Sequence, residues 1–323
     1  MRAASLLLLV AALLWTIYPA ALDPNGCRRL LAVHRMAALG VVAFNCYLLA
    51  QGRGFVEVEN KSIFRFGGLL VNPIQMSTFV VLTTPSCLLG VRERGWRSWH
   101  GLVFAGLMVS LVPTQSRGGL LAVLFGATLF LWLVSDPAAR QRWITMALLT
   151  MPLVLLVDWQ RSLARGEGDS LWSVFYTARI ALWCDLLTHF KTSPWIGHGF
   201  GCSHLFNRLV VADSDYADMH VHNSYLEVFG DLGLLGAVLL GMLLVGIFLH
   251  CRRSLQVMDA RTRDVHAAMF ATVCSGLLDA VSDSWLLSVG NNSCVMFWVM
   301  VAALVARADS VVAQPIPSVP CDH

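Results

Sequence analysis

Long apolar segments constrain the fold of this chain more than any other feature. Hydrophobic residues make up 57% of the sequence and charged residues 13%, whereas a soluble domain has roughly 45–50% and about 25%. A helix needs about 20 apolar residues to cross a bilayer, and several segments reach that length. The alternation over about ten residues that is typical of an outer-membrane barrel is absent. The sequence therefore predicts an all-α, polytopic bundle of transmembrane helices.

About nine segments are expected to cross the membrane. They lie at about 3–22, 31–50, 69–90, 99–115, 119–135, 144–158, 223–250, 266–288 and 293–306. The first could pass for a signal peptide, but no small-x-small cleavage site precedes the turn at residues 23–26. We predict a single integral membrane domain over residues 1–323, with a long loop at 159–222 that contributes the active site.

Basic residues cluster in alternate connections, which predicts the orientation of the bundle. These connections contain Arg28 and Arg29; Arg92, Arg94 and Arg97; Arg140 and Arg142; and Arg252, Arg253, Arg261 and Arg263. The positive-inside rule makes their side cytoplasmic. Residues 51–68, the corner at 114–118 and the loop at 159–222 then face outwards, into the periplasm of a Gram-negative host.

The net charge of +3 is small and spread over many loops, so it does not indicate a nucleic-acid partner. Four of the nine cysteines, Cys46, Cys87, Cys274 and Cys294, lie inside expected spans. Cys184 and Cys202 share the long loop, where they could form a disulfide or remain as two thiols.

The long loop has the composition of a structured segment. Loops of more than about 15 residues are usually functional or disordered. Trp172, Phe175, Arg179 and Trp183 recur at helical spacing, which predicts an amphipathic helix on the membrane surface. A tight, glycine-rich turn follows at residues 194–201.

Two arginines are candidates for binding phosphate. Arg117 lies in the short corner between two spans, and Arg179 lies on the expected amphipathic helix. A guanidinium binds anionic oxygens bidentately and stays charged in apolar surroundings. Contact with lipid headgroups is the alternative for both, and Arg179 could also pair with Asp185. Facing one cleft, the two would clamp a pyrophosphate.

His222 is the candidate base, because it lies where the polar loop meets an apolar helix. Asn223 or Ser224 is expected to cap this helix. The positive end of the helix dipole would then keep the imidazole neutral and able to accept a hydroxyl proton. Asn223 and Glu227 lie on one face, where they could orient the acceptor or the imidazole. A structural histidine with ordinary capping is the alternative.

Other chemistries have weaker support. His220 and His222 invite a zinc interpretation, but no ligand spacing of a zinc site accompanies them. No GxSxG motif indicates a serine nucleophile. Asp279 and Asp283 fall within an expected span, where carboxylates are usually functional. They could line the cleft, pair with an arginine or form a polar path, although Asp283 is near the outer end.

Taken together, these residues resemble the O-antigen ligase and polymerase superfamily from about Phe66 onward. The matching pieces are Arg65, Phe66, Gly67 and Gly68 with Asn72 and Pro73; the corner Ser116, Arg117, Gly118 and Gly119; Arg179 with Trp183 before Pro194, Gly197 and Gly199; and His222 and Asn223 before Gly233 and Gly236. Their order around one long outer loop makes the combination specific.

The resemblance implies a glycosyltransferase that needs no metal or other cofactor. Such enzymes move a glycan from undecaprenyl pyrophosphate to an acceptor hydroxyl at the periplasmic face of the bacterial inner membrane. It implies that Arg117 and Arg179 hold the pyrophosphate and that His222 activates the acceptor for inverting displacement. Arg65, Asn223 and Glu227 are further expected substrate-binding residues.

The acceptor stays open at this point. A ligase would use lipid A core, a polymerase a second carrier-linked repeat, and a protein oligosaccharyltransferase Ser or Thr. Family members commonly have more spans, which suggests that leading helices are absent. A transporter or flippase of lipid-linked glycans is the alternative class, and it predicts two related halves, of which the sequence has no sign.

Overall fold

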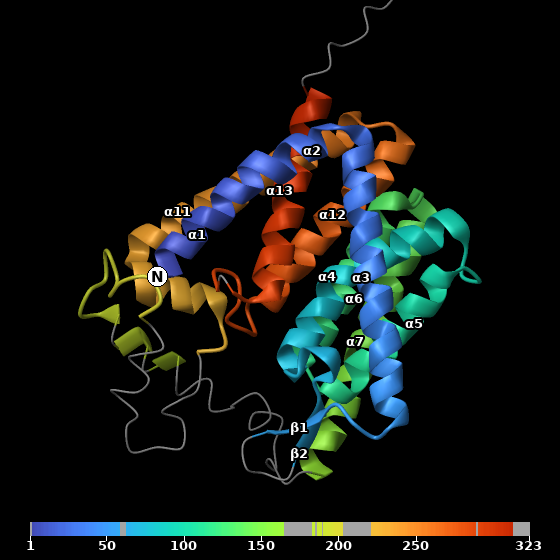
Figure 1. Cartoon of the computed structure of the whole chain (residues 1–323), viewed down its shortest axis with the longest axis horizontal. Helices are drawn as coiled ribbons and strands as arrows, with labels where there is room; N and C mark the ends of the chain where they lie inside the picture. Colours follow the sequence, from blue (N-terminus) through green and yellow to red (C-terminus); the bar gives the residue numbers. More distant parts are fainter. Residues whose placement is uncertain are drawn as a thin grey trace, which may run out of the picture.

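The computed structural model describes residues 2–58, 63–164, 183–184, 186–188, 190–202, 221–288 and 290–312. Helices dominate these residues, and a single two-stranded hairpin accompanies them (Figure 1). The prediction of an all-α membrane bundle is therefore confirmed.

A helix occupies each expected span. The helices are α1 Arg2–Ala12, which continues through η1 Leu13–Ile17 into α2 Tyr18–Leu22, and then α3 Pro24–Ala50, α4 Pro73–Arg94, α5 Trp99–Leu111, α6 Arg117–Val134, α7 Pro137–Ala164, α11 Ser224–Val257, α12 Ala260–Asp279 and α13 Asn292–Val312. Short 3-10 turns lie at η2 Gly68–Leu70 and η3 Val112–Thr114. Among the described residues, six helical stretches are long and apolar enough to cross a membrane by themselves, and they comprise Ser5–Leu22, α3, α4, α6, α11 and residues 292–311 of α13. The spans expected at 99–115, 144–158 and 266–288 correspond to α5, α7 and α12, which are shorter or less apolar.

Polar residues fix where several helices begin. The Asn72 carboxamide accepts the amide of Ile74 at 2.8 Å, and Pro73 takes the first helical position of α4. Asp259 caps α12 in the same way, and hydrogen bonds from Thr262 lower the pKa of its carboxyl. Each cap fixes the residue at which its helix begins, so the chain can start a new helix soon after the preceding one ends.

α4 is the central helix, with nearly every side chain from Met76 to Val91 buried. Its threonines are compatible with this burial, because the hydroxyls of Thr83 and Thr84 donate hydrogen bonds to backbone carbonyls of the preceding turn, at 2.7 and 2.8 Å.

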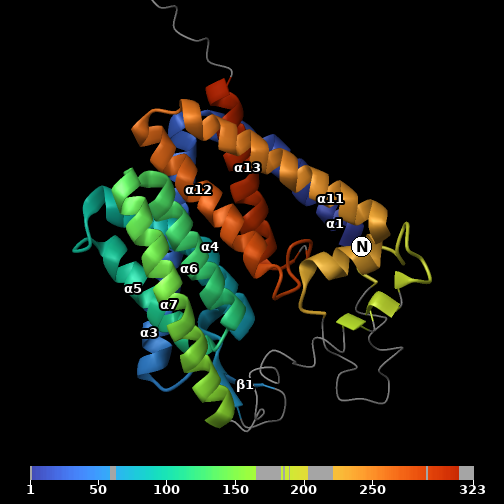
Figure 2. The ribbon, with the colours of Figure 1, turned by 180° about the vertical axis from the view of Figure 1, so that it is seen from behind.

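α11 differs from α4 in its exposure. Its apolar residues after Gly233 are largely exposed, and Figures 1 and 2 show it leaning away from the group of α3 to α7. This part of α11 suits contact with lipid.

The basic connections gather at one end of the bundle, as predicted. Arg92 pairs with Asp264 at 2.8 Å, and Arg28 lies 3.9 Å from Glu93. Arg28 also donates to the carbonyl of Arg261 at 3.4 Å. Three connections that are far apart in sequence therefore meet at this end.

The opposite end carries a hairpin that the sequence analysis did not predict. Strand β1 Phe55–Val58 pairs antiparallel with β2 Ile63–Phe66, so that Phe55 lies opposite Phe66. The Arg65 Nε donates to the carbonyl of Thr114 at 2.7 Å. This bond ties the hairpin to the corner between α5 and α6.

One predicted boundary was wrong. α12 ends at Asp279 rather than near residue 288, so Asp283 lies in the α12–α13 connection and not inside a span. The amide of Ser282 turns back to the carbonyl of Asp279 at 2.9 Å. Ser282, Asp283 and Ser284 favour such a turn, because short polar side chains compete with the helix for backbone hydrogen bonds.

Candidate functional site

Arg117 is the first residue of α6, and two glycines let its backbone enter a crowded place. Ser116 caps the helix by accepting the amide of Gly119 at 3.3 Å. A side chain on Gly118 would overlap Ser282, and one on Gly119 would overlap Ser77 of α4. The two glycines after Arg117 are thus explained by close packing against α4 and the α12–α13 connection.

His222 contacts the α12–α13 connection as well, at Asp283, the residue after Ser282. Its Nδ1 is 3.2 Å from Oδ1 of Asp283, and the side chains are only 18% and 14% exposed. The residue has a φ of 50°, which is uncommon for a side chain other than glycine. Just before it, the Trp183 indole donates to the carbonyl of Val221 at 2.8 Å. The backbone just before His222 is thus bonded to Trp183, and the imidazole contacts Asp283.

The start of α11 is fixed to the connection by hydrogen bonds. The Asn223 carboxamide accepts the amides of Tyr225 and Leu226, both at 3.0 Å, which confirms the predicted cap. Ser224 Oγ donates to the carbonyl of Asp283 at 2.7 Å and accepts the amide of Trp285 at 3.0 Å. These contacts hold the residues that flank His222 in register with Asp283.

Asp279 anchors the connection to the centre of the bundle. Its Oδ2 accepts the hydroxyl of Thr78 in α4 at 2.8 Å and the indole of Trp285 at 3.1 Å. The connection therefore contacts α4 through Asp279, the Arg117 corner through Ser282, and His222 through Asp283. Gly118, the residue after Arg117, lies against Ser282, and the imidazole of His222 contacts Asp283, the next residue of the same connection.

Gly233 interrupts α11 just beyond the site. It has φ 64° and ψ −164°, outside the helical region. The break exposes backbone groups that the turn at residues 194–201 satisfies. Pro194 accepts the amide of Leu234 at 2.9 Å, and Gly199 donates to the carbonyl of Asp231 at 2.9 Å. The backbone of this turn approaches Gly233 so closely that a side chain there would overlap it.

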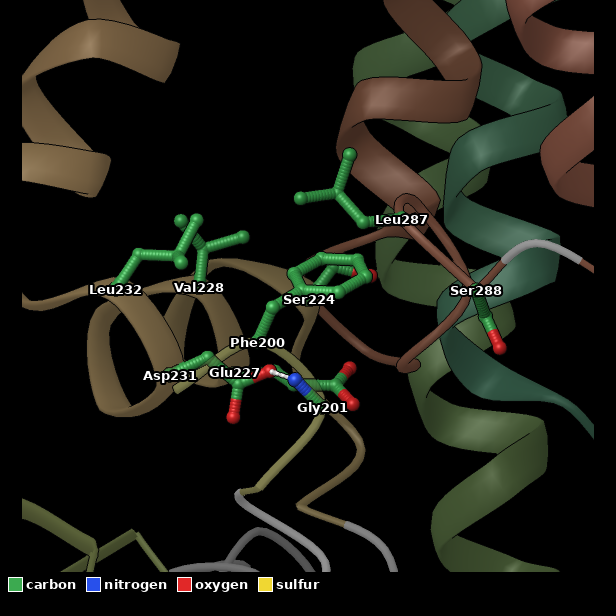
Figure 3. A pocket seen from close by; sticks show the side chains of 9 residues that line it. All are labelled: Phe200, Gly201, Ser224, Glu227, Val228, Asp231, Leu232, Leu287 and Ser288. Carbon is green, nitrogen blue, oxygen red and sulfur yellow. Dashed lines mark hydrogen bonds between the residues drawn. The ribbon is translucent and has the colours of Figure 1, made fainter. Parts of the chain in front are cut away.

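A cleft opens beside this arrangement, with an empty volume of about 460 Å³ that is continuous with solvent. It is lined by Phe200, Gly201, Ser224, Glu227, Val228, Asp231, Leu232, Leu287 and Ser288. Figure 3 shows the apolar side chains towards one side and the carboxylates of Glu227 and Asp231 towards the other, with Asp231 bonded to the amide of Gly201. Glu227, an expected site residue, thus faces a cavity one turn after His222.

The other expected residues have different outcomes. Arg65 lies at the corner of Arg117 through its bond to Thr114. Arg179 lies outside the described residues with most of the amphipathic helix expected around it, and so does His220 of the zinc interpretation. His198 is described and contacts Thr192 at 2.9 Å and the carbonyl of Gly230 at 3.4 Å. Cys184 and Cys202 are free thiols.

The pairing of Asp283 with His222 was not predicted from the sequence. Asp283 is unusual in an apolar segment, but it was expected inside a helix, and 61 residues separate it from His222. The signal that could have shown the turn is the polar run of Ser282, Asp283 and Ser284, which is unsuited to the middle of a span.

Comparison with known families gives one match. Residues 100–241 match the family model described as O-antigen ligase. The matched range contains Arg117, Arg179 and His222, whereas Arg65 and Asp283 lie outside it. A search of curated proteins found no match.

Proposed function

We propose a reaction for this chain on the basis of its family and of the site around His222. The match over residues 100–241 identifies the chain as a member of the O-antigen ligase and polymerase superfamily. The chain is an integral membrane protein with a role in glycan assembly. In our proposal it transfers a glycan from undecaprenyl pyrophosphate to an acceptor hydroxyl at the periplasmic face of the inner membrane.

The observation that carries this proposal is the contact between His222 and Asp283 beside the Arg117 corner. With the proton on Nδ1 directed at Asp283, Nε2 carries the lone pair. A nitrogen in this state takes the proton of an attacking hydroxyl, and general-base catalysis of this kind contributes about 10²–10⁴-fold. His222 is therefore the proposed base and Asp283 the residue that positions it.

The leaving pyrophosphate requires positive charge. Arg117 supplies a guanidinium at the corner, Arg65 lies against the same corner, and Arg179 is a third candidate. The N-termini of α4, α6, α11 and α13 lie at this end of the molecule (Figure 1), and their dipoles add further positive potential. These groups can stabilise charge on a diphosphate directly, so the proposed mechanism is metal-independent and, with base and leaving group on opposite faces of the sugar, inverting.

Orientation follows from the charge distribution. The end with Arg28, Arg92 and Arg261 carries the basic connections, and the positive-inside rule assigns it to the cytoplasm. The site then faces the periplasm. Asn223 and Glu227 remain proposed substrate-binding residues, and the acceptor decides between a ligase and a polymerase. Neighbouring core-biosynthesis genes would favour the ligase, and neighbouring flippase genes the polymerase.

His222→Ala is the direct test. We expect transfer from the host's undecaprenyl pyrophosphate-linked glycan to fall by at least about 10²-fold, because the base is lost, while binding of undecaprenyl pyrophosphate persists. Transfer is measured with purified protein, and polysaccharide in a complemented deletion strain.

His250→Ala is the matched control. His250 also contacts an aspartate, Asp309, at 2.8 Å, and it lies far from the site, in the second half of α11, the helix that begins two residues after His222. Full transfer by this variant is expected. Full transfer by His222→Ala would refute the proposed mechanism.

A further inference from the structure

The cleft next to His222 has one wall made by a single face of α11. Its residues recur at helical spacing, and they are Ser224, Glu227, Val228, Asp231 and Leu232. Phe200 and Gly201 of the glycine-rich turn and Leu287 and Ser288 of the α12–α13 connection complete the lining. The cleft thus begins two residues after the proposed base.

The charge of the lining argues against a diphosphate. The nine described residues that line it include two carboxylates, Glu227 and Asp231, and no basic side chain. Asp231 is 3% exposed and bonded to the Gly201 amide. Like charges disfavour each other strongly where water is partly excluded. Carboxylates accept hydrogen bonds from neutral hydroxyls, and such charge-assisted bonds are strong.

The apolar side of the cleft complements this polar edge. Phe200, Val228 and Leu287 lie towards the same side in Figure 3. A sugar ring has C–H faces that pack against apolar side chains and hydroxyls around its rim that need acceptors. Sites for small ligands combine an apolar lining with a few placed polar groups in this way.

The walls are also fixed before any ligand arrives. The turn that carries Phe200 is bonded to the broken segment of α11 through Gly199 and Gly201, and Phe190 stacks on Phe229 at 3.8 Å from outside the cleft. Preorganised walls reduce the entropy lost on binding.

Successive residues of the α12–α13 connection contact the Arg117 corner, His222 and the cleft, in that order. Ser282 packs on the Arg117 corner, Asp283 contacts His222, and Leu287 and Ser288 line the cleft. Among the described residues, the corner that carries Arg117 therefore lies against the connection before Asp283, and the cleft with Glu227 and Asp231 is lined by residues after it.

We propose that this cleft binds the neutral, hydroxyl-rich sugar of the acceptor, with Glu227 accepting its hydroxyls and Phe200 packing against its ring. The proposal rests on the proposed function, because it assigns the acceptor to the side of His222 away from Arg117.

Binding of neutral oligosaccharides, released from the host's own surface polysaccharide by mild acid, tests the site without turnover. Saturation-transfer NMR on the purified chain should detect binding that weakens at least about fivefold, or ~1 kcal/mol, in Glu227→Gln and Phe200→Ala. Leu239→Ala, on the exposed second half of α11, is the control and should bind like the parent. Size-exclusion profiles and unfolding temperatures verify that the near-isosteric Glu227→Gln is folded.

Undecaprenyl pyrophosphate binding is measured on the same variants and should be unchanged. Unaltered oligosaccharide binding by folded Glu227→Gln and Phe200→Ala would overturn the acceptor assignment, as would a loss confined to undecaprenyl pyrophosphate.

This outcome is independent of the His222→Ala assay. If Glu227→Gln and Phe200→Ala weaken oligosaccharide binding but His222→Ala keeps full transfer, the proposed mechanism alone is rejected. If His222→Ala loses transfer but Glu227→Gln and Phe200→Ala bind the oligosaccharide like the parent, the acceptor assignment of the cleft alone is rejected.

Discussion

His222 is constrained twice, by its backbone and by its partner. A left-handed φ costs a residue with a side chain of the order of 1–3 kcal/mol when the surroundings do not enforce it, and here the bonds of Asn223 and Ser224 to the connection enforce it. The ring then meets Asp283 at 3.2 Å. Strain of this kind is compatible with a side chain that is positioned for a reaction.

Asp283→Asn tests the positioning role. The amide keeps the size of the carboxylate but no longer favours a single imidazole tautomer, so we expect the kcat of transfer to fall by at least about tenfold and less than in His222→Ala. The KM for the undecaprenyl pyrophosphate donor should change little. Steady-state kinetics of the purified variant measure both.

A double variant separates positioning from a structural effect. If Asp283 acts through His222, adding Asp283→Asn to His222→Ala should cause no further loss of transfer. Additive losses, or an unfolding temperature of Asp283→Asn well below that of the parent, would contradict the positioning role.

The sequence indicated most of the individual residues, but not which of them meet. His222, Glu227 and Asp283 were recognisable because polar residues beside apolar helices are costly and need a reason. Their contacts depend on the turn after Asp279, which local hydrophobicity does not encode. The pairing of His222 with Asp283 is a tertiary contact across 61 residues.

Among the helices, the apolar segments were predictable because bilayer thickness fixes their length. The hairpin at β1 and β2 was missed, since it is short and its alternation resembles any amphipathic loop. The break in α11 was also missed. The backbone conformation of Gly233, which is almost restricted to glycine, makes room for the glycine-rich turn.

Gly118→Ala tests whether the entry of α6 positions Arg117. The new methyl group would overlap Ser282, so we expect the corner to shift and undecaprenyl pyrophosphate binding to weaken by at least about tenfold, towards the level of Arg117→Ala. Binding is measured on purified protein in detergent.

A second substitution should reverse the effect. Among the described residues, only the Ser282 side chain lies within reach of that methyl group, so Ser282→Gly in the Gly118→Ala background removes the overlap and should restore most of the binding. Gly241→Ala, where a methyl group would meet no described atom within 4 Å, controls for the loss of a glycine. Unimpaired binding by Gly118→Ala would refute this account of the corner.

For the molecule as a whole, ion pairs at one end and the candidate site at the other predict opposite exposure across the membrane. In a variant without native cysteines, Gly52→Cys, next to the hairpin, should react with an impermeant maleimide in cells whose outer membrane is permeabilised. Gly95→Cys, beside the basic connection, should react only after the inner membrane is opened. Both glycines have open space for a side chain among the described residues, but their positive φ, 63° and 85°, strains a cysteine, so the folding of both variants is checked before labelling. The reverse labelling pattern would invert the proposed topology.

The contact between His222 and Asp283 has a consequence for how this architecture can be divided. The family match stops at residue 241, yet the carboxylate that holds the imidazole arrives with α12 and α13. A protein cut after residue 241 would keep the whole matched range and lose the aspartate that contacts His222. The proposed site is therefore no portable module, and moving the matched stretch into another chain would preserve it only when the last two helices travel with it.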